Sequence, residues 1–291
     1  MDISLIVCTR DRAHALERML ATLEQLVFAG SWEAVLVDNG SVDQTAQVLR
    51  RFANNTRLNV RLAFEGKKGL ASARNCGIRH SCGSVLAFTD DDCYPDPGFL
   101  TAIAKRLSDP TVSFCGGQVL LFDPADRPVT IQARKEPLAI LGGQFLKSGL
   151  IHGANMAVKR CSLLRVRGFD ERLGAGTFFK SGEDTDLLRR LAWSGENGFF
   201  DPDIRVRHHH GRNTIAQEMA LRKGYQRGIG AGLAKFALYQ ETRWVALRSF
   251  FWQMRGAPLW RKMRLLIFAA EFSRRVGFSS KTAWEHPSSL S

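Results

Sequence analysis

Long apolar runs are missing from this sequence, and their absence excludes several classes of protein. No window reaches the ~18 uninterrupted apolar residues that a membrane-spanning helix needs, although 45% of the 291 residues are hydrophobic. The segment 1–10 has no basic region followed by an apolar stretch, so we expect no signal peptide. The composition instead favours a large buried core, in one α/β domain with an extension.

Paired cysteines are also missing. The six cysteines are scattered without any C-x-x-C pair: Cys8, Cys76, Cys82, Cys93, Cys115 and Cys161. In a chain of this length without a secretion signal, we interpret them as reduced thiols of the core. The pattern excludes a disulfide scaffold and predicts a reducing compartment, the cytoplasm.

Acidic residues are scarce in the last third of the chain. Residues 205–291 carry 16 Lys and Arg but only 4 Asp and Glu. They therefore hold +12 of the net charge of +13, and residues 1–204 are nearly neutral. The basic part of the molecule is its C-terminal segment.

A dinucleotide-binding glycine motif does not follow the first predicted strand. That position holds Thr9-Arg10-Asp11-Arg12, which disfavours a dehydrogenase and also the glycine-rich basic loop of a sugar-nucleotide nucleotidyltransferase. The glycines in 228–232 lie far from any strand-to-helix junction of the predicted sheet. We interpret them as a helix break or a close-packing site.

Short apolar runs alternate with helical patterns in residues 1–120. The runs are four to six residues long, as expected of strands buried on both faces: Ile3–Cys8, Ala34–Val37, Val60–Phe64, Val85–Thr89 and Val112–Cys115. The clearest helical stripe is Leu16, Met19, Leu20 and Leu23. The alternation predicts an α/β fold with a mostly parallel sheet and helices on both faces.

Polar residues follow three of these runs. They are Thr9-Arg10-Asp11, Asp38-Asn39-Gly40-Ser41 and Asp90-Asp91-Asp92. Ligands of such sheets bind outside the carboxyl ends of the strands, so a ligand site is expected there. The three consecutive carboxylates repel one another, and a divalent cation is the usual compensation. Oxygen ligands favour Mg²⁺ or Mn²⁺, with diphosphate oxygens completing the shell. The alternative is a solvated acidic turn.

Two further segments carry candidate chemistry. Acidic residues at 183–186 precede a helical pattern, where they are either partners of the helix dipole or, held ionised by backbone N–H groups, a general base. The histidines at 208–210 are either a surface turn or ligands of a transition metal.

Five segments occur in an order that resembles family 2 glycosyltransferases. They are VLVDNGSVDQT (35–45), GLASARNCGI (69–78), FTDDDCYPDP (88–97), GFDERLG (168–174) and SGEDTDLLRRL (181–191). The resemblance covers residues 3–212 and implies a GT-A fold with a Rossmann-like sheet. We therefore expect a catalytic domain at 1–210, with a nucleotide-sugar half at 1–120 and an acceptor half at 121–210. A basic, amphipathic helical extension at 211–291 follows.

The resemblance also implies roles for single residues. The donor would be bound by Thr9, Arg10, Asp11, Asp38, Arg74, Asp90 and Asp91. Asp92 and His208 would hold Mn²⁺ or Mg²⁺, although the adjacent histidines leave the register open. Asp184 would be the catalytic base of an inverting transfer to an acceptor hydroxyl, with Glu183 and Asp186 orienting it or binding the acceptor.

Aromatic and basic residues interleave in the extension. One predicted helical face carries Trp244, Leu247, Phe251 and Met254, and a second carries Leu259, Met263, Leu266, Ile267 and Ala270. This pattern fits helices at an anionic membrane surface through residues 211–281, on the inner face of the cell membrane. Packing on the catalytic domain is the alternative. A nucleic-acid-binding module would leave the acidic run unexplained, so the expected partners are a nucleotide-sugar donor and a glycan or lipid-linked acceptor, with no nucleic acid.

Overall fold

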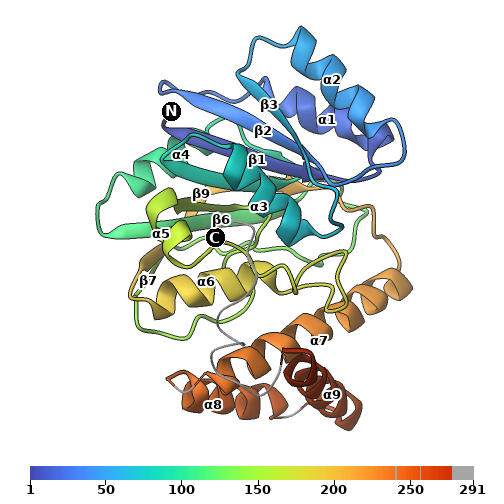
Figure 1. Ribbon diagram of the computed structural model, residues 1–291, viewed down its shortest axis with the longest axis vertical. Coiled ribbons are helices and arrows are strands. Elements are labelled where there is room, and N and C mark those ends of the chain that lie inside the picture. Colours follow the sequence, from blue (N-terminus) through green and yellow to red (C-terminus); the bar gives the residue numbers. More distant parts are fainter. Residues whose placement is uncertain (240, 256, 277–291) are drawn as a thin grey trace.

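A mixed sheet between two helical layers forms the centre of the computed structural model (Figure 1), which describes residues 1–239, 241–255 and 257–276. The described residues form nine strands, in the order β3-β2-β1-β4-β8-β6-β9-β5, with β7 paired to β9. The strands are β1 (Ile3–Thr9), β2 (Trp32–Asp38), β3 (Val60–Phe64), β4 (Val85–Asp90), β5 (Cys93–Pro95), β6 (Val112–Leu121), β7 (Leu138–Ile140), β8 (Met156–Lys159) and β9 (Asn197–His208).

The predicted α/β fold is confirmed, and the N-terminal part of the sheet is entirely parallel. β3, β2, β1 and β4 all pair in parallel, so their carboxyl ends meet at one edge of the sheet. Beyond β4 the sheet is mixed, because β8 runs antiparallel to both β4 and β6.

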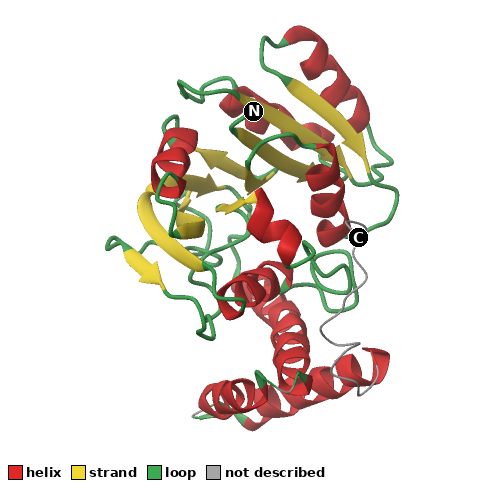
Figure 2. Ribbon diagram, turned by 60° about the vertical axis from the view of Figure 1, so that its left-hand side comes forward, coloured by secondary structure: helices red, strands yellow, loops and turns green. Residues whose placement is uncertain are grey.

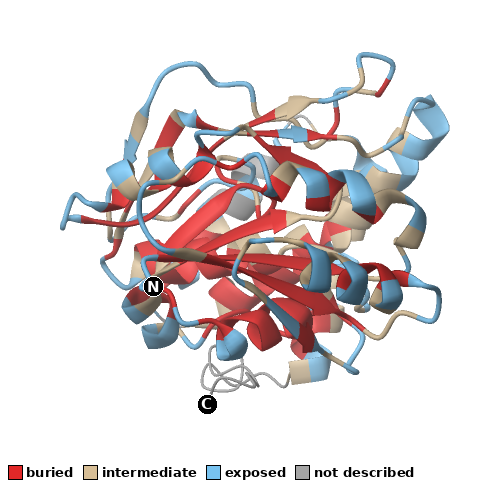
Figure 3. Ribbon diagram, turned by 90° about the horizontal axis from the view of Figure 1, so that it is seen from above, coloured by how far each residue is buried: buried red, intermediate tan, exposed pale blue. Residues whose placement is uncertain are grey.

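Two hydrophobic cores lie on opposite faces of the sheet. Helices α1 (Ala13–Leu23), α2 (Thr45–Asn55) and α4 (Phe99–Leu107) bury their apolar residues against one face. Helices α3 (Leu70–His80), α5 (Arg160–Arg165) and α6 (Glu183–Trp193) cover the other. Successive side chains of β1 alternate between the two cores, with Leu5 in the first and Ile6 in the second. The central strands are accordingly buried, whereas the outer helices expose one side (Figure 3).

Two expectations about burial were wrong. β3 is not buried on both faces: it is the edge strand of the sheet, and Phe64 at its end is 67% exposed. The six thiols are all free, but Cys82 and Cys161 are exposed and do not belong to the core. Both lie at the ends of core elements, just after α3 and within the short helix α5.

Three helices form the C-terminal extension: α7 (Ile215–Leu238), α8 (Arg243–Met254) and α9 (Leu259–Val276). They lie beyond α6, at the end of the molecule away from β3 (Figures 1 and 2). α7 begins with a capping box, in which the Thr214 hydroxyl and the Gln217 side chain satisfy backbone N–H groups. Within the described ranges, no helix is both long and apolar enough to cross a bilayer.

The glycines in 228–232 are close-packing positions inside α7, as one of the two readings of the sequence predicted. A Cβ at Gly228 would lie 2.2 Å from the carbonyl oxygen of Ser181, and a Cβ at Gly230 would lie 2.9 Å from that of Leu265. The backbone of α7 therefore packs directly against the backbone of two other segments. One is the segment before α6, at Gly228, and the other is α9, at Gly230.

The apolar stripe predicted for α9 is one face of that helix, and it is turned to solvent. Leu259, Met263, Leu266 and Ile267 are each more than half exposed, and Trp260 joins them. The opposite side of α9, with Leu265 and Phe272, is buried. On α8, Trp244 and Phe251 are also exposed, while the side chain of Met254 lies outside the described residues. The part of the predicted membrane surface at 277–281 lies outside them too.

Candidate active site

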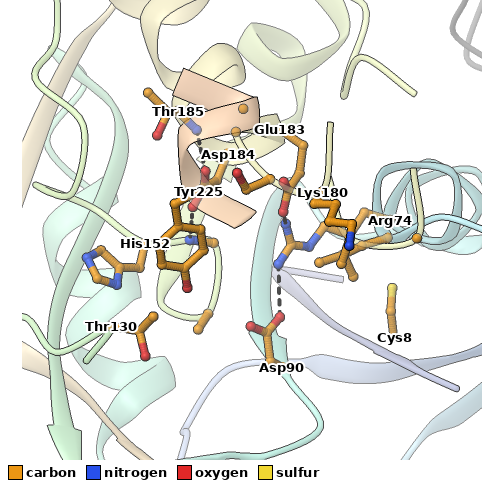
Figure 4. Close-up of a pocket in the computed structure, with 18 of the residues that line it drawn as sticks. Cys8, Arg74, Asp90, Thr130, His152, Lys180, Glu183, Asp184, Thr185 and Tyr225 are labelled. Carbon is orange, nitrogen blue, oxygen red and sulfur yellow. Dashed lines mark hydrogen bonds and ion pairs between the residues drawn. The ribbon is translucent and has the colours of Figure 1, made fainter. Parts of the chain in front are cut away.

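A cavity of about 860 Å³ opens at the carboxyl ends of β1 and β4. Its walls include the loops after these strands, the start of α3, the segment from Ser148 to Ala154, the start of α6, and α7. Figure 4 shows side chains from all of these regions pointing into one space. The expectation of a ligand site at this edge thus coincides with a real cavity, whose size suits a small-molecule ligand.

The acidic run after β4 is neutralised by arginines. The Arg74 guanidinium lies 2.9 Å from Asp90 Oδ1. The Arg12 guanidinium lies 2.8 Å from Asp92 Oδ2 and 3.4 Å from Asp91 Oδ1. The run is therefore part of a charged network at the cavity wall, and the alternative of a free solvated turn is not supported.

Asp91 and Asp92 have opposite pKa shifts although they are neighbours. Burial raises the pKa of Asp91 to about 6, and the charge of Asp92 adds to this against the effect of Arg12. Burial also opposes ionisation of Asp92, but its hydrogen bond to His208 and the charges of His208, Arg12 and Arg212 lower its pKa to about 2. Asp92 is thus a permanent anion at neutral pH.

Of the three adjacent histidines, His208 is the one that faces Asp92. Its Nε2 lies 3.3 Å from Asp92 Oδ1, and its Nδ1 lies 3.1 Å from the Thr130 hydroxyl. His209 packs against Phe122, and His210 reaches Asp126 instead. Because side chains alternate along β9 and its extension, His209 points away from His208. The His210 ring lies 5.0 Å from the His208 ring but pairs with Asp126 and not with Asp92.

The Asp92–His208 pair fits a hard divalent cation. Two ligands at right angles on an ion with ~2.1 Å bonds are about 3 Å apart, close to the 3.3 Å between the two facing atoms. Cys93 has its Sγ in the same group. Its thiol is a soft donor, which a hard cation such as Mg²⁺ disfavours compared with carboxylate oxygen. The donors are then one carboxylate and one imidazole, which suit Mn²⁺ or Mg²⁺ with substrate oxygens.

Asp184 lies in the first turn of α6, opposite the acidic run. Gly182 precedes this helix with a left-handed φ of 96°, which turns the chain sharply into it. The Asp184 carboxylate accepts hydrogen bonds from the backbone N–H groups of Gly153 at 3.0 Å and Thr185 at 2.6 Å. These bonds fix the orientation of the carboxylate.

Arg74 connects the two acidic sets. Its Nη2 pairs with Asp90, and its Nη1 donates to Glu183 Oε1 at 3.0 Å, so the guanidinium stands between them (Figure 4). Burial and the charge of Asp184 raise the pKa of Glu183 to about 7, against the effect of Arg74. Glu183 is therefore poised to hold a proton near neutral pH.

Asp186 is paired away from the centre of the cavity. Its carboxylate lies 2.8 Å from Arg190 Nη2 and 2.7 Å from Lys235 Nζ of α7. Lys235 also contacts Asp170 at 2.8 Å, and all four side chains are buried. A buried ionic cluster thus joins α6 to the extension.

The remaining donor candidates divide into two groups. Thr9 and Arg10 line the cavity, and Arg10 Nη1 donates to the Asn39 carbonyl oxygen at 2.6 Å. Asp11 and Asp38 stand behind the wall, where their carboxylates accept from the N–H groups of Val42 and Ser41. They shape the loops rather than face the cavity.

Three contributions to the cavity had no role assigned from the sequence, although Asn39 belongs to the polar segment 38–41 expected at this edge. Asn39 lines it and braces the approach to α3, with its Oδ1 accepting from Gly69 N at 2.9 Å. Arg12 spans Asp91 and Asp92. α7 supplies Leu221, Tyr225 and Ile229 to the wall. These three residues are spaced i, i+4, i+8, which is the spacing of one helical face. That spacing is the sequence signal from which this side of α7 could have been predicted.

Comparison with known proteins agrees with this geometry. The family model described as glycosyl transferase family 2 matches residues 4–173, which is more than half of the chain. The pre-mycofactocin glycosyltransferase of Mycobacterium tuberculosis is 29% identical over 245 residues, covering 80% of this chain and 47% of that protein. The succinoglycan biosynthesis protein ExoU of Rhizobium meliloti is 28% identical over 204 residues, covering 67% and 58%. The chain thus spans about half the length of these relatives.

A solved structure supports the fold. The mannosyltransferase PcManGT from Pyrobaculum calidifontis, in complex with GDP-Man and Mn²⁺, superposes with a TM-score of 0.62 at 21% identity, covering 97% of this chain and 84% of that one. At that identity the likeness establishes the fold alone. The expected GT-A fold is confirmed, and the chain belongs to glycosyl transferase family 2.

Proposed function

We propose that this protein transfers a sugar from a nucleoside-diphosphate sugar to an acceptor hydroxyl, with inversion at the anomeric carbon. The observation that carries the proposal is one cavity lined both by Asp90–Asp92 and by Asp184. The first set suits the diphosphate of a donor, and the second suits removal of a proton from an acceptor. The reacting atoms would lie between them.

The donor half of the proposal rests on the loops after β1, β2 and β4. Thr9, Arg10 and Asn39 would contact the nucleoside, while Asp11 and Asp38 keep their loops in shape. Asp90, Asp91 and Arg74 would lie nearest the ribose and diphosphate.

Asp92 and His208 would hold Mn²⁺ or Mg²⁺. When bound, the cation supplies a Lewis acid for the negative charge that develops on the departing diphosphate. The 3.3 Å separation of the two facing atoms supports this assignment, as does the Mn²⁺ in the mannosyltransferase complex.

Asp184 would act as the base. Its carboxylate takes the proton of the acceptor hydroxyl, and that oxygen forms the new bond to the anomeric carbon on the face opposite the nucleotide. The nucleoside diphosphate leaves with the electrons of the old bond, so configuration is inverted. Glu183 and Arg74 would orient the start of α6, and Asp186 would fix the same helix through Lys235 and Arg190.

The acceptor would enter along α7. Leu221, Tyr225 and Ile229 offer an apolar and aromatic wall near Asp184, which suits a glycan ring or the head of a lipid-linked glycan. The name of the succinoglycan relative points to polysaccharide synthesis. The solvent-facing apolar stripe of α9, beside a basic rim, supports docking of the extension on an anionic membrane at its cytoplasmic face.

A panel of nucleoside diphosphates tests the proposal, with thermal unfolding measured in the presence and absence of Mn²⁺. We expect one diphosphate to raise the unfolding temperature only with Mn²⁺, and Asp92→Ala to abolish that shift. Asp184→Asn should retain the shift but lose about 10³-fold in turnover of the matching nucleotide sugar. Asp203→Asn, at an exposed position on β9, is the control and should behave as wild type. Absence of stabilisation by every diphosphate, under every metal condition, would contradict the proposal.

A further inference from the structure

Arg12 contacts both of the acids nearest the candidate cation site. It lies in the loop between β1 and α1, and the acids lie in the loop after β4, which pairs directly with β1. The Arg12 Nη2 to Asp92 Oδ2 distance is 2.8 Å, and the Nε to Asp91 Oδ1 distance is 3.4 Å. The contact is therefore a two-point clamp on neighbouring carboxylates.

The clamp leaves Asp92 fully engaged. One carboxylate oxygen faces Arg12, and the other faces His208, its partner in the candidate cation site. A divalent cation bound between Asp92 and His208 would bring a charge of the same sign close to the Arg12 guanidinium. Like charges at such distances repel, and the effect is strong where water is partly excluded. Cation and guanidinium therefore compete for Asp92.

Arg12 is the most exposed member of this group. Its side chain is 37% exposed, whereas those of Asp91 and Asp92 are 11% and 14% exposed. The two acids lie in a half-buried turn, and the arginine reaches them from the rim on a long side chain. Moving the Arg12 side chain therefore costs less free energy than moving either aspartate. A displaced guanidinium would still line the same cavity. There it could donate two hydrogen bonds to a pair of oxygens of a bound diphosphate.

We propose that Arg12 is an exchange cation: it neutralises Asp91 and Asp92 before the divalent cation binds, then releases Asp92 and pairs with the donor diphosphate. This inference rests on the proposed function, since it needs a diphosphate donor and a cation at Asp92 and His208. It adds a residue that opposes cation binding in the free protein and favours the donor afterwards. These two effects have opposite signs, which a purely structural arginine would not produce.

The test measures Mn²⁺ affinity without nucleotide, by the electron paramagnetic resonance signal of free Mn²⁺, and nucleoside diphosphate affinity at saturating Mn²⁺, by calorimetry. In Arg12→Gln we expect Mn²⁺ to bind about five- to tenfold more tightly, and the diphosphate about tenfold more weakly. Arg12→Lys keeps the charge without the two-point geometry and should fall between Arg12→Gln and wild type in both measurements.

Arg51→Gln is the control, because it removes the same charge outside the cavity, where the guanidinium pairs with Glu17. Its Mn²⁺ affinity should remain within about twofold of wild type, as expected for a charge that makes no contact with Asp92. Unchanged or weaker Mn²⁺ binding in Arg12→Gln would overturn the exchange. Failure of the wild type to bind either Mn²⁺ or any diphosphate would instead overturn the proposed function itself.

Discussion

Arg74 and Glu183, which are 109 residues apart in the sequence, are joined by a 3.0 Å hydrogen bond in the wall of the cavity. The bond ties α3, on the donor side, to the first turn of α6, which carries Asp184. Both side chains are buried, so the protonation state of Glu183 bears on the stability of the whole domain.

The pH dependence of stability should reveal Glu183. Its pKa is raised to about 7, so between roughly pH 4.5 and 7 the folded protein keeps a proton that the unfolded chain releases. The unfolded state then binds fewer protons, and the free energy of unfolding falls as pH rises through this window. Glu183→Gln should remove this contribution, on the order of 2 kcal/mol, when urea unfolding is compared at pH 5 and pH 7.5. A pH dependence identical to wild type would contradict the assignment, and exposed Glu17→Gln serves as the control.

Lys235→Met should strongly destabilise the fold. The change leaves Asp186 without its α7 partner and takes the buried ammonium from Asp170. Asp170 and Asp186 would keep their arginine partners, Arg172 and Arg190, and the loss of two buried ionic contacts costs about 3–5 kcal/mol. Urea unfolding measures the loss. Lys223→Met on the exposed part of α7 should change stability by less than about 0.5 kcal/mol, and equal effects of the two would refute the role of the cluster.

Two glycines of α7 should respond to alanine in opposite ways. At Gly230 the new Cβ would lie 2.9 Å from the Leu265 carbonyl oxygen and from the Phe268 Cβ, so α9 must move away. We expect a loss of about 1–3 kcal/mol. At Gly224 no atom lies within 4 Å of the new Cβ, so the better helix propensity of alanine should stabilise by up to about 1 kcal/mol. Thermal unfolding measures the stability of both variants. A Gly230→Ala variant more stable than wild type would contradict the close packing.

Acidic substitutions on the exposed face of α9 should weaken vesicle binding. Met263→Glu with Ile267→Glu removes apolar anchors that are 54% and 57% exposed, and adds charge that anionic lipid repels. In co-sedimentation with phosphatidylserine vesicles at moderate salt, we expect at least about a tenfold loss of bound protein. Val27→Glu makes the same kind of change at a position 66% exposed outside the extension and should bind as wild type. If the wild-type protein does not bind vesicles but binds nucleic acid, the membrane assignment is wrong.

Much of this architecture could be predicted because it is local. Apolar runs locate β1, β2 and β4 within a residue or two at each end, and the stripe on α1 is fully buried. The strand ends then follow, because parallel neighbours finish at one edge. The acidic run and the segment at 183–186 reach the same cavity as expected. Their roles in catalysis await the experiments above.

The remaining features depend on pairing across long sequence distances. The antiparallel strand β8 is only four residues long, and no short-range pattern says that it inserts between β4 and β6. Arg12 is one of many arginines in the sequence, and its contact with Asp92 is separated by 80 residues. Lys235 and Asp186 likewise look like ordinary surface charges until the helices pack. Such contacts depend on the tertiary structure, and no periodic pattern in the sequence predicts them.

The ionic contacts between α6 and α7 determine where the chain can be truncated without loss of stability. A boundary at 210 follows the change in charge along the sequence, yet the buried ammonium that contacts both Asp170 and Asp186 comes from residue 235. A fragment ending at 210 would retain two interior anions while losing their lysine, and would open one wall of its own cavity to water. We therefore expect α7 to belong to the folding unit, and shortened versions for expression or crystallisation should retain it to its end at Leu238.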